Sequence, residues 1–207
     1  MGVISNGTTL IDAGALDSGV ATGSLVHIKT LTASSSANLS FVHGSSSVVL
    51  DSTYPIYVFK FINMHPSSDV ANFQFNMSTD SGSNYNITKT STFFRAIHNE
   101  SDSAALLSYQ AAFDIAQGTG FQVLSEQIGF DNDQASSGTL QLFNPSSTVF
   151  VKHFIGDFNC SSETDFSMRD LSAGYGNTTS AVNAIQFKMS AGNIDSGTIK
   201  LYGIKDS

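Results

Sequence analysis

The side chains best suited to hold a metal ion are scattered along the chain. The five histidines stand far apart, and no pair has the spacing of a zinc motif such as HExxH. The segment "HNESD" places His98, Glu100 and Asp102 at alternate positions, which one face of a strand would bring together. In a serine-rich stretch this pattern is more typical of a solvated polar loop. We therefore predict no metal site at these residues.

Two aspartate-rich segments have part of the pattern of a calcium loop. "DNDQASSG" contains Asp131 and Asp133, and "TDSGS" contains Asp80. A calcium loop supplies oxygen ligands at alternating positions and usually ends on an acidic residue, whereas the pattern of carboxylates stops early in both segments and serine follows. Turns are therefore the favoured interpretation of both segments.

The sequence contains no recognisable catalytic set. Cys160 is the single cysteine and has no base beside it in "FNCSSE", so we expect a small buried or half-buried side chain. A GxSxG motif, a phosphate-binding loop and a dinucleotide fingerprint are absent. The three glutamates stand in expected loops or strand edges, which does not predict a facing pair of glycosidase carboxylates. We predict a protein that is not an enzyme, with no catalytic residue, no cofactor and no metal.

Aromatic side chains offer one alternative chemistry, the stacking of sugar rings. Trp is absent, and the phenylalanines mostly follow strand patterns that place them in a core. The tyrosines are better surface candidates, and the predicted loop "AGYGNTT" is a possible position for a glycan site. The alternative glycan-contact residues are Tyr85, Tyr109 and Tyr175.

The composition indicates an all-β protein. Charged residues make up 13% of the chain, about half of the usual share, and Ser, Thr, Asn and Gly take their place. These residues disfavour helices and are typical of extracellular, fibrous and virion β proteins. The net charge of −8 and the unclustered Lys and Arg residues argue against binding to nucleic acid, and no apolar run is long enough for a membrane span. Because the N-terminus lacks a leader pattern, we expect synthesis in a cytoplasm and no membrane partner.

Residues 1–24 have a different pattern from the rest. Their apolar residues follow neither a helical nor a strand period, which predicts an extended N-terminal arm before a single β-sandwich domain at residues 25–207. A free arm has little reason to keep so many aliphatic side chains, so we expect it to lie against its own domain, a sister subunit or another protein. The predicted interaction residues are Val3, Ile4, Leu10, Ile11 and Leu16.

Strand patterns begin at residue 25. "SLVHIKTLTASSSANLSFVHG" alternates loosely, whereas "IYVFKFIN" has apolar residues on both faces, which predicts a central strand. The next segment, "ANFQFNMSTDSGSNYNITKTSTFFRAIH", predicts a hairpin. Its "TDSGSN" would form the turn, and Tyr85 and Ile87 would begin the return strand.

The second half of the chain predicts further short strands. "SAALLSYQAAFDIAQG" allows either a short helix or turn that ends at Gly118, or a strand over "LLSYQ". Segments rich in Gly, Asn, Asp and Ser, among them "SAGYGNTT", are the expected turns between the later strands. We predict an antiparallel, jelly-roll-like β-sandwich with at most one short helix. The later strands are "FQVLSEQIGF", "GTLQLFN", "TVFVKHFIGDF", "AVNAIQFKMS" and "GTIKLYGIK".

Two of these strands have similar sequences, "SGTLQLF" and "SGTIKLY". Leu140 and Leu142 are expected on one face of the first strand, as are Ile199 and Leu201 on one face of the second. This similarity is too short and too isolated to indicate a repeat architecture with a fixed period. It predicts two similar strands of one sandwich.

Four segments together resemble small virion proteins of tailed bacteriophages, particularly phages of marine bacteria and cyanobacteria. The resemblance implies a structural protein with a β-sandwich or jelly-roll that assembles on the particle, commonly as a homotrimer. The four segments, which are distributed from the first residues of the sequence to the last, are "MGVISNGTTLIDAGALDSG", "YVFKFINMHPSSDVANFQFNMSTDSGSNYN", "SGTLQLFNPSSTVFVKHF" and "TTSAVNAIQFKMSAGNIDSGTIKLYGIK".

Within that group the sequence favours a capsid decoration, or cement, protein. Such a protein would lie on the capsid exterior, bind the major capsid protein and stabilise the shell by binding only its assembled form. A compact domain, an apolar arm and no fibre-shaft segment favour this role. The alternatives are the head domain of a tail fibre or spike that binds a host glycan, and a minor tail component.

Overall fold

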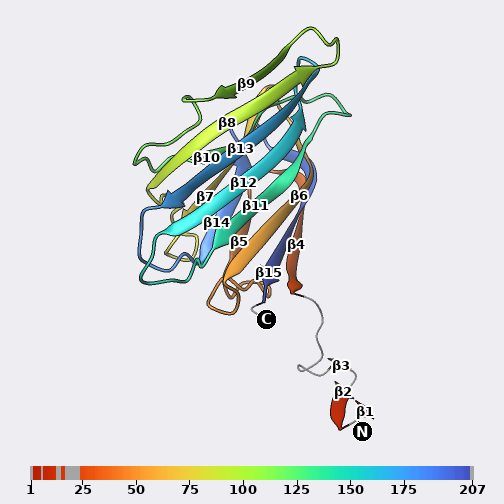
Figure 1. Cartoon of the computed structure of the whole chain (residues 1–207), viewed down its shortest axis with the longest axis vertical. Coiled ribbons are helices and arrows are strands. Elements are labelled where there is room, and N and C mark those ends of the chain that lie inside the picture. Colours follow the sequence, from red (N-terminus) through yellow and green to blue (C-terminus); the bar gives the residue numbers. More distant parts are fainter. Residues whose placement is uncertain (1, 6, 13–14, 17–23, 206–207) are drawn as a thin grey trace.

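The structure is a computed structural model that describes residues 2–5, 7–12, 15–16 and 24–205, and over these residues the chain is all-β (Figure 1). Two antiparallel sheets pack face to face as a β-sandwich, and the arm forms a small third sheet. The predicted fold class is therefore confirmed. The strands are β1 (Val3–Ser5), β2 (Thr8–Asp12), β3 (Ala15–Leu16), β4 (Leu25–Ser36), β5 (Leu39–Val42), β6 (Ile56–Pro66), β7 (Ala71–Ser78), β8 (Lys89–Asn99), β9 (Ala105–Tyr109), β10 (Gln122–Ile128), β11 (Ser136–Phe143), β12 (Lys152–Ser161), β13 (Phe166–Gly176), β14 (Ala184–Met189) and β15 (Ile194–Ile204).

The two sheets of the sandwich differ in size. The larger has eight strands in the order β4-β15-β6-β11-β12-β13-β8-β9, and the smaller has four in the order β10-β7-β14-β5. The smaller sheet covers only part of one face of the larger one, whose other face is turned toward the viewer in Figure 1. We call that uncovered side the outer face.

Phenylalanine rings fill the space between the sheets. The ring of Phe187 in β14 has its centroid 5.3 Å from that of Phe59 and 5.0 Å from that of Phe61, both in β6. Phe73 of β7 completes this centre with its ring nearly parallel to Phe187 at 6.0 Å. Each buried ring removes a large apolar area from water, so this cluster is a main source of stability for a chain without a disulfide.

The two strands with similar sequences have equivalent positions in the larger sheet. The strands β11 and β15 lie on either side of β6 and pair with it in antiparallel register, so that Leu140 and Leu201 both stand opposite Phe59. Leu140, Leu142, Ile199 and Leu201 have no exposed surface. The predicted facing of both strands and the central position of β6 are confirmed. Both repeats have the same pattern because both complete the same layer of the core.

The predicted hairpin at residues 71–98 is wrong. The strand β7 belongs to the smaller sheet, between β10 and β14, and β8 belongs to the larger sheet, between β13 and β9. The connection at residues 79–88 therefore crosses between sheets instead of turning back. Asp80 stabilises this connection because its carboxylate accepts hydrogen bonds from Ser78 Oγ at 2.6 Å and Asn84 Nδ2 at 2.7 Å. These hydrogen bonds lower the pKa of Asp80 to about 2, which fits the turn predicted for "TDSGS".

Two other expectations are decided by the structure. The segment "LLSYQ" forms most of the edge strand β9 and is followed by turns, so the strand interpretation holds and the helix interpretation does not. "SAGYG", expected as a turn, is the end of strand β13. Gly174 is a glycine there because an added Cβ would collide with Thr90 O and Ser91 of β8, not because the chain turns. The glycan loop expected at "AGYGNTT" is therefore mostly strand.

Candidate interaction surfaces

The structure leaves the first two predicted arm residues exposed. Val3 and Ile4 lie in β1 with 55% and 65% of their surface accessible, and β1 pairs with β2. In the described residues, the three arm strands pair only with one another. Leu10 and Ile11 belong to β2 and Leu16 to β3, but their side chains lie outside the described part of the chain. The role of the arm as an interface stays a prediction.

The three candidate glycan-contact tyrosines do not form one site. Tyr85 is half-buried in the connection between β7 and β8, where its carbonyl accepts a hydrogen bond from Asn76. Tyr109 lies on the edge strand β9 opposite Phe94, and its hydroxyl donates to Asp114 at 2.5 Å. Tyr175 lies on β13, two strands away. Their positions give no cluster of rings at one end of the sandwich.

The outer face carries an apolar hollow of about 510 Å³ over strands β8, β13 and β12. Small residues form its floor, since Ala173 and Gly174 lie between the longer side chains of neighbouring strands. Ile155, His153 and Tyr175 stand around it, with the rings of His153 and Tyr175 6.1 Å apart. The complete lining is Thr90, Ser91, Thr92, His153, Phe154, Ile155, Ala173, Gly174 and Tyr175, without Asp, Glu, Lys or Arg.

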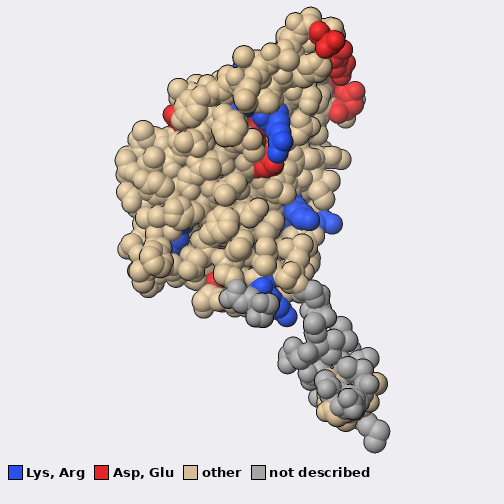
Figure 2. Space-filling model, viewed as in Figure 1, with Lys and Arg blue, Asp and Glu red and all other residues tan. Residues whose placement is uncertain are grey.

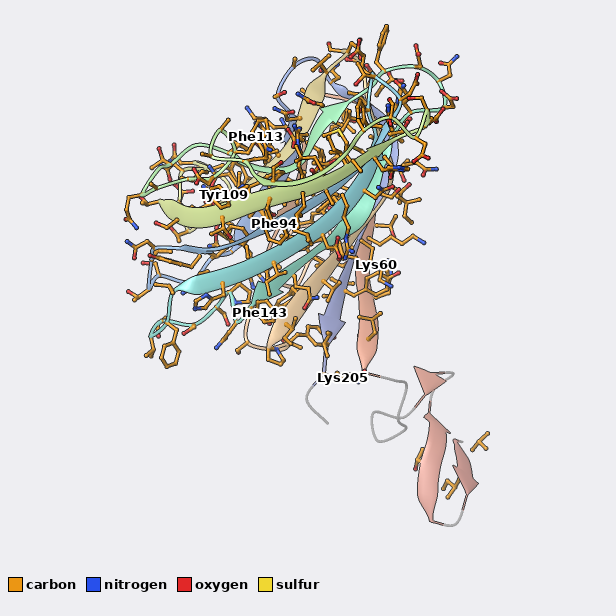
Figure 3. All side chains as sticks on the ribbon, turned by 45° about the horizontal axis from the view of Figure 1, so that its top comes forward. Lys60, Phe94, Tyr109, Phe113, Phe143 and Lys205 are labelled. Atoms are coloured by element: carbon orange, nitrogen blue, oxygen red, sulfur yellow. The ribbon has the colours of Figure 1, made fainter. Side chains whose placement is uncertain are left out.

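Further apolar side chains extend this surface toward the edge of the sheet. Phe94 of β8 is 39% exposed, and Leu107 and Tyr109 of β9 are 71% and 55% exposed. Figure 3 labels Phe94, Tyr109 and Phe143 along the larger sheet, from its β9 edge toward its middle. Contiguous apolar surface of this kind is typical of interaction sites. The sequence did not reveal it, because the strand pattern alone does not show that the smaller sheet leaves one side of β8, β13 and β12 uncovered.

A second apolar feature is the tip of the loop between β11 and β12. Val149 and Phe150 are 68% and 67% exposed. Ser147 holds their backbone, because its hydroxyl accepts hydrogen bonds from Val149 N at 3.2 Å and Phe150 N at 3.0 Å. We call Val149 and Phe150 the knob.

Lys152 binds the backbone of this loop at its base. Its side chain is fully buried, and its ammonium group donates to the carbonyl oxygens of Ser147 and Phe150, both at 2.7 Å. A longer bond of 3.3 Å reaches Thr178 O in a neighbouring loop. Burial lowers the pKa of Lys152. A buried ammonium with three carbonyl acceptors restrains the backbone of the loop that carries the knob.

Acidic residues collect at the opposite end of the sandwich from the arm. The tips of the β8–β9 and β12–β13 hairpins touch there, since Glu100 N donates to Asp165 O at 3.1 Å. Figure 2 shows red carboxylates grouped at this end, away from the arm. The knob belongs to the other end, at which β11 ends and β12 begins. The acidic residues of the three adjoining loops are Glu100, Asp102, Asp131, Asp133, Glu163 and Asp165.

The candidate metal residues do not converge in the described part of the chain. His98 Nε2 lies 3.1 Å from Asp102 Oδ1, and both side chains are largely exposed. Among the described residues no group of three or more His, Cys, Asp or Glu is placed to hold a metal ion. Asp131 lies in a turn, where its carbonyl accepts from Gln134 N at 2.9 Å, as the turn interpretation predicts.

The sequence did not predict a buried polar cluster between the sheets. Glu126 of β10 forms an ion pair with Arg95 of β8 at 2.9 Å, and its backbone N donates to Asp170 Oδ2 of β13 at 2.9 Å. Both carboxyl groups are fully buried, and burial raises the pKa of Asp170 to about 7 and also raises that of Glu126. Cys160, buried as expected, donates from Sγ to Glu126 O at 3.3 Å. These contacts attach β10 to three strands of the larger sheet, and both carboxyl groups are buried, so we assign the cluster a structural role.

No protein-family model, curated protein or solved structure matches the chain in comparisons with known proteins. The described residues contain no helix whose length and hydropathy would suit a membrane span.

Proposed function

We propose that this chain is a non-enzymatic structural protein of a phage virion that decorates the capsid exterior. It binds the major capsid protein through its arm end and stabilises the assembled shell as a homotrimer. The observation that carries the proposal is the polarity of the molecule. The exposed apolar residues Val3 and Ile4 belong to the arm, and six carboxylates lie at the opposite end of the sandwich.

This polarity suits a protein fixed to a large surface at one end. Exposed apolar side chains on short strands and loops are the groups that gain free energy when a partner covers them. Carboxylates at the far end keep the outer surface of a decorated particle hydrated and repel other particles. A protein that binds only the assembled shell stabilises it by mass action, and several linked copies add avidity.

The experiment that tests this function is the imaging of intact virions that carry a tagged copy of the chain. We expect copies spread over the icosahedral shell. Density confined to the tail would overturn the decoration role.

Removal of the arm tests the docking end. A variant without residues 1–20 is expected to remain folded, because β4 to β15 form the sandwich without the arm strands, and to lose binding to the particle. A milder variant, Val3→Ser with Ile4→Ser, is expected to weaken binding in the same direction, as measured by cosedimentation with particles stripped of the protein. Equal binding by the truncated and complete chains would show that the arm is not the docking element.

A further inference from the structure

The knob and the hollow are complementary features of the same chain. The knob presents two adjacent apolar side chains on a loop that a buried lysine restrains. The hollow is an open, uncharged depression of about 510 Å³ with small residues at its floor. Both border strand β12, since Phe150 comes two residues before the strand and His153 and Ile155 of the strand line the hollow.

We propose that the knob of one copy inserts into the hollow of a second copy. The inference deepens the homotrimer part of the proposed function, because it names the surfaces through which copies of the chain would associate. Insertion would cover Val149 and Phe150, and it would cover the exposed half of Ile155 in the hollow. Phenylalanine in an apolar pocket is the kind of anchor that supplies most of the energy of an interface.

Charge is compatible with a second copy as the occupant. With a net charge of −8, two copies repel each other unless they meet where neither presents carboxylates. The loop "NPSSTVFV" at residues 144–151 has no charged residue, and the lining of the hollow has no Asp, Glu, Lys or Arg. The six carboxylates of the hairpin-tip end lie away from both.

The area that a stable interface buries favours a contact that extends beyond the knob. A stable interface buries about 800 Å² on each partner. The hollow adjoins exposed Phe94, Leu107 and Tyr109 on the same sheet, and these side chains supply apolar surface on which the body of the second copy can rest. In a homotrimer each copy would insert its knob into the next copy and receive a knob in its own hollow, and repetition of this heterologous contact closes into a ring when the rotation allows it.

The first test is the mass of the purified chain by sedimentation at micromolar concentrations. We expect an oligomer for the wild type, and for Val149→Ser with Phe150→Ser a dissociation constant raised about tenfold or more. Phe130→Ser is the matched control, because Phe130 is 50% exposed in the loop that contains Asp131, at the acidic end. A monomeric wild type, an unchanged oligomer in the knob variant, or equal dissociation of the Phe130 variant would each overturn the inference.

A second test detects the contact by a covalent cross-link. Thr148→Cys, which leaves both knob side chains in place, and Thr92→Cys are made in separate chains, mixed and oxidised, since Thr148 is exposed beside the knob, Thr92 lines the hollow and the native Cys160 is buried. We expect a mixed disulfide dimer from this pair and none from Phe130→Cys mixed with Thr92→Cys. Absence of the mixed dimer would overturn the inference. Both tests use the purified chain without particles, so their failure would leave binding to the shell as a separate question.

Discussion

The side-chain amino group of Lys89 allows a test of the burial that the structure shows, because the core holds this group without an acidic partner. Its side chain has no exposed surface, and Nζ donates to Asn76 Oδ1 at 2.6 Å and to Ile87 O at 2.8 Å. A neutral amine has two N–H donors, which these two acceptors satisfy. Burial lowers the pKa of Lys89 from 10.5 to about 7, since the interior disfavours the charged form.

The sign of the effect on stability follows from proton binding. Between the folded pKa of about 7 and the unfolded pKa of 10.5, the unfolded chain binds more protons than the folded one, so the free energy of unfolding rises with pH in this range. With these two values, the contribution of Lys89 rises by about 2 kcal/mol between about pH 7 and about pH 9. Cys160, whose pKa burial raises to about 12 from 9.0, acts in the opposite direction only above that window.

The assay is urea unfolding of the wild type and of Lys89→Met at several pH values. Methionine is similar in shape and cannot titrate, so the difference in unfolding free energy between the two proteins should change by about 2 kcal/mol over the window. Lys60→Met, at an exposed position of β6, is the matched control and should follow the wild type. A constant difference between the wild type and Lys89→Met across the window would refute the assignment of a buried, neutral lysine.

Three further predictions concern other buried positions. Burial raises the pKa of Asp170 to about 7 from 3.8, so its contribution to stability is greatest at low pH and is lost as pH rises toward 7. In unfolding titrations at about pH 5 and about pH 7, the free energy of unfolding of Asp170→Asn should therefore fall less between the two pH values than that of the wild type. Gly174→Ala should destabilise the sandwich by about 1–3 kcal/mol in thermal or urea unfolding, because the new Cβ meets the backbone of β8, whereas Gly120→Ala, with open space around it, should have little effect. Cys160, 1% exposed and with its thiol pKa raised to about 12, should not react with a thiol reagent in the folded protein and should react fully in urea; fast reaction under native conditions would contradict its burial.

The sequence by itself determined the class of the fold and the facing of its best strands. Alternation is local, so Leu140 and Leu142 could be assigned to the same face of their strand, and the similar sequences correctly indicated two equivalent strands. Apolar residues on both faces of "IYVFKFIN" correctly indicated a central strand. A buried or half-buried position could be expected for Cys160 because a free cysteine behaves as a small apolar side chain, and the structure shows it buried.

Only the tertiary structure decided which strands meet and what lies between them. The strands β7 and β8 look like a hairpin in sequence but pair in different sheets, because their partners β14 and β13 come from the far end of the chain. Gly174 resembles a turn residue until the backbone of β8 is seen against it. The burial of Glu126 and Asp170 and the apolar hollow depend in the same way on side chains from several strands. These features follow from contacts between residues distant in sequence, and the spacing of residues along one strand does not contain that information.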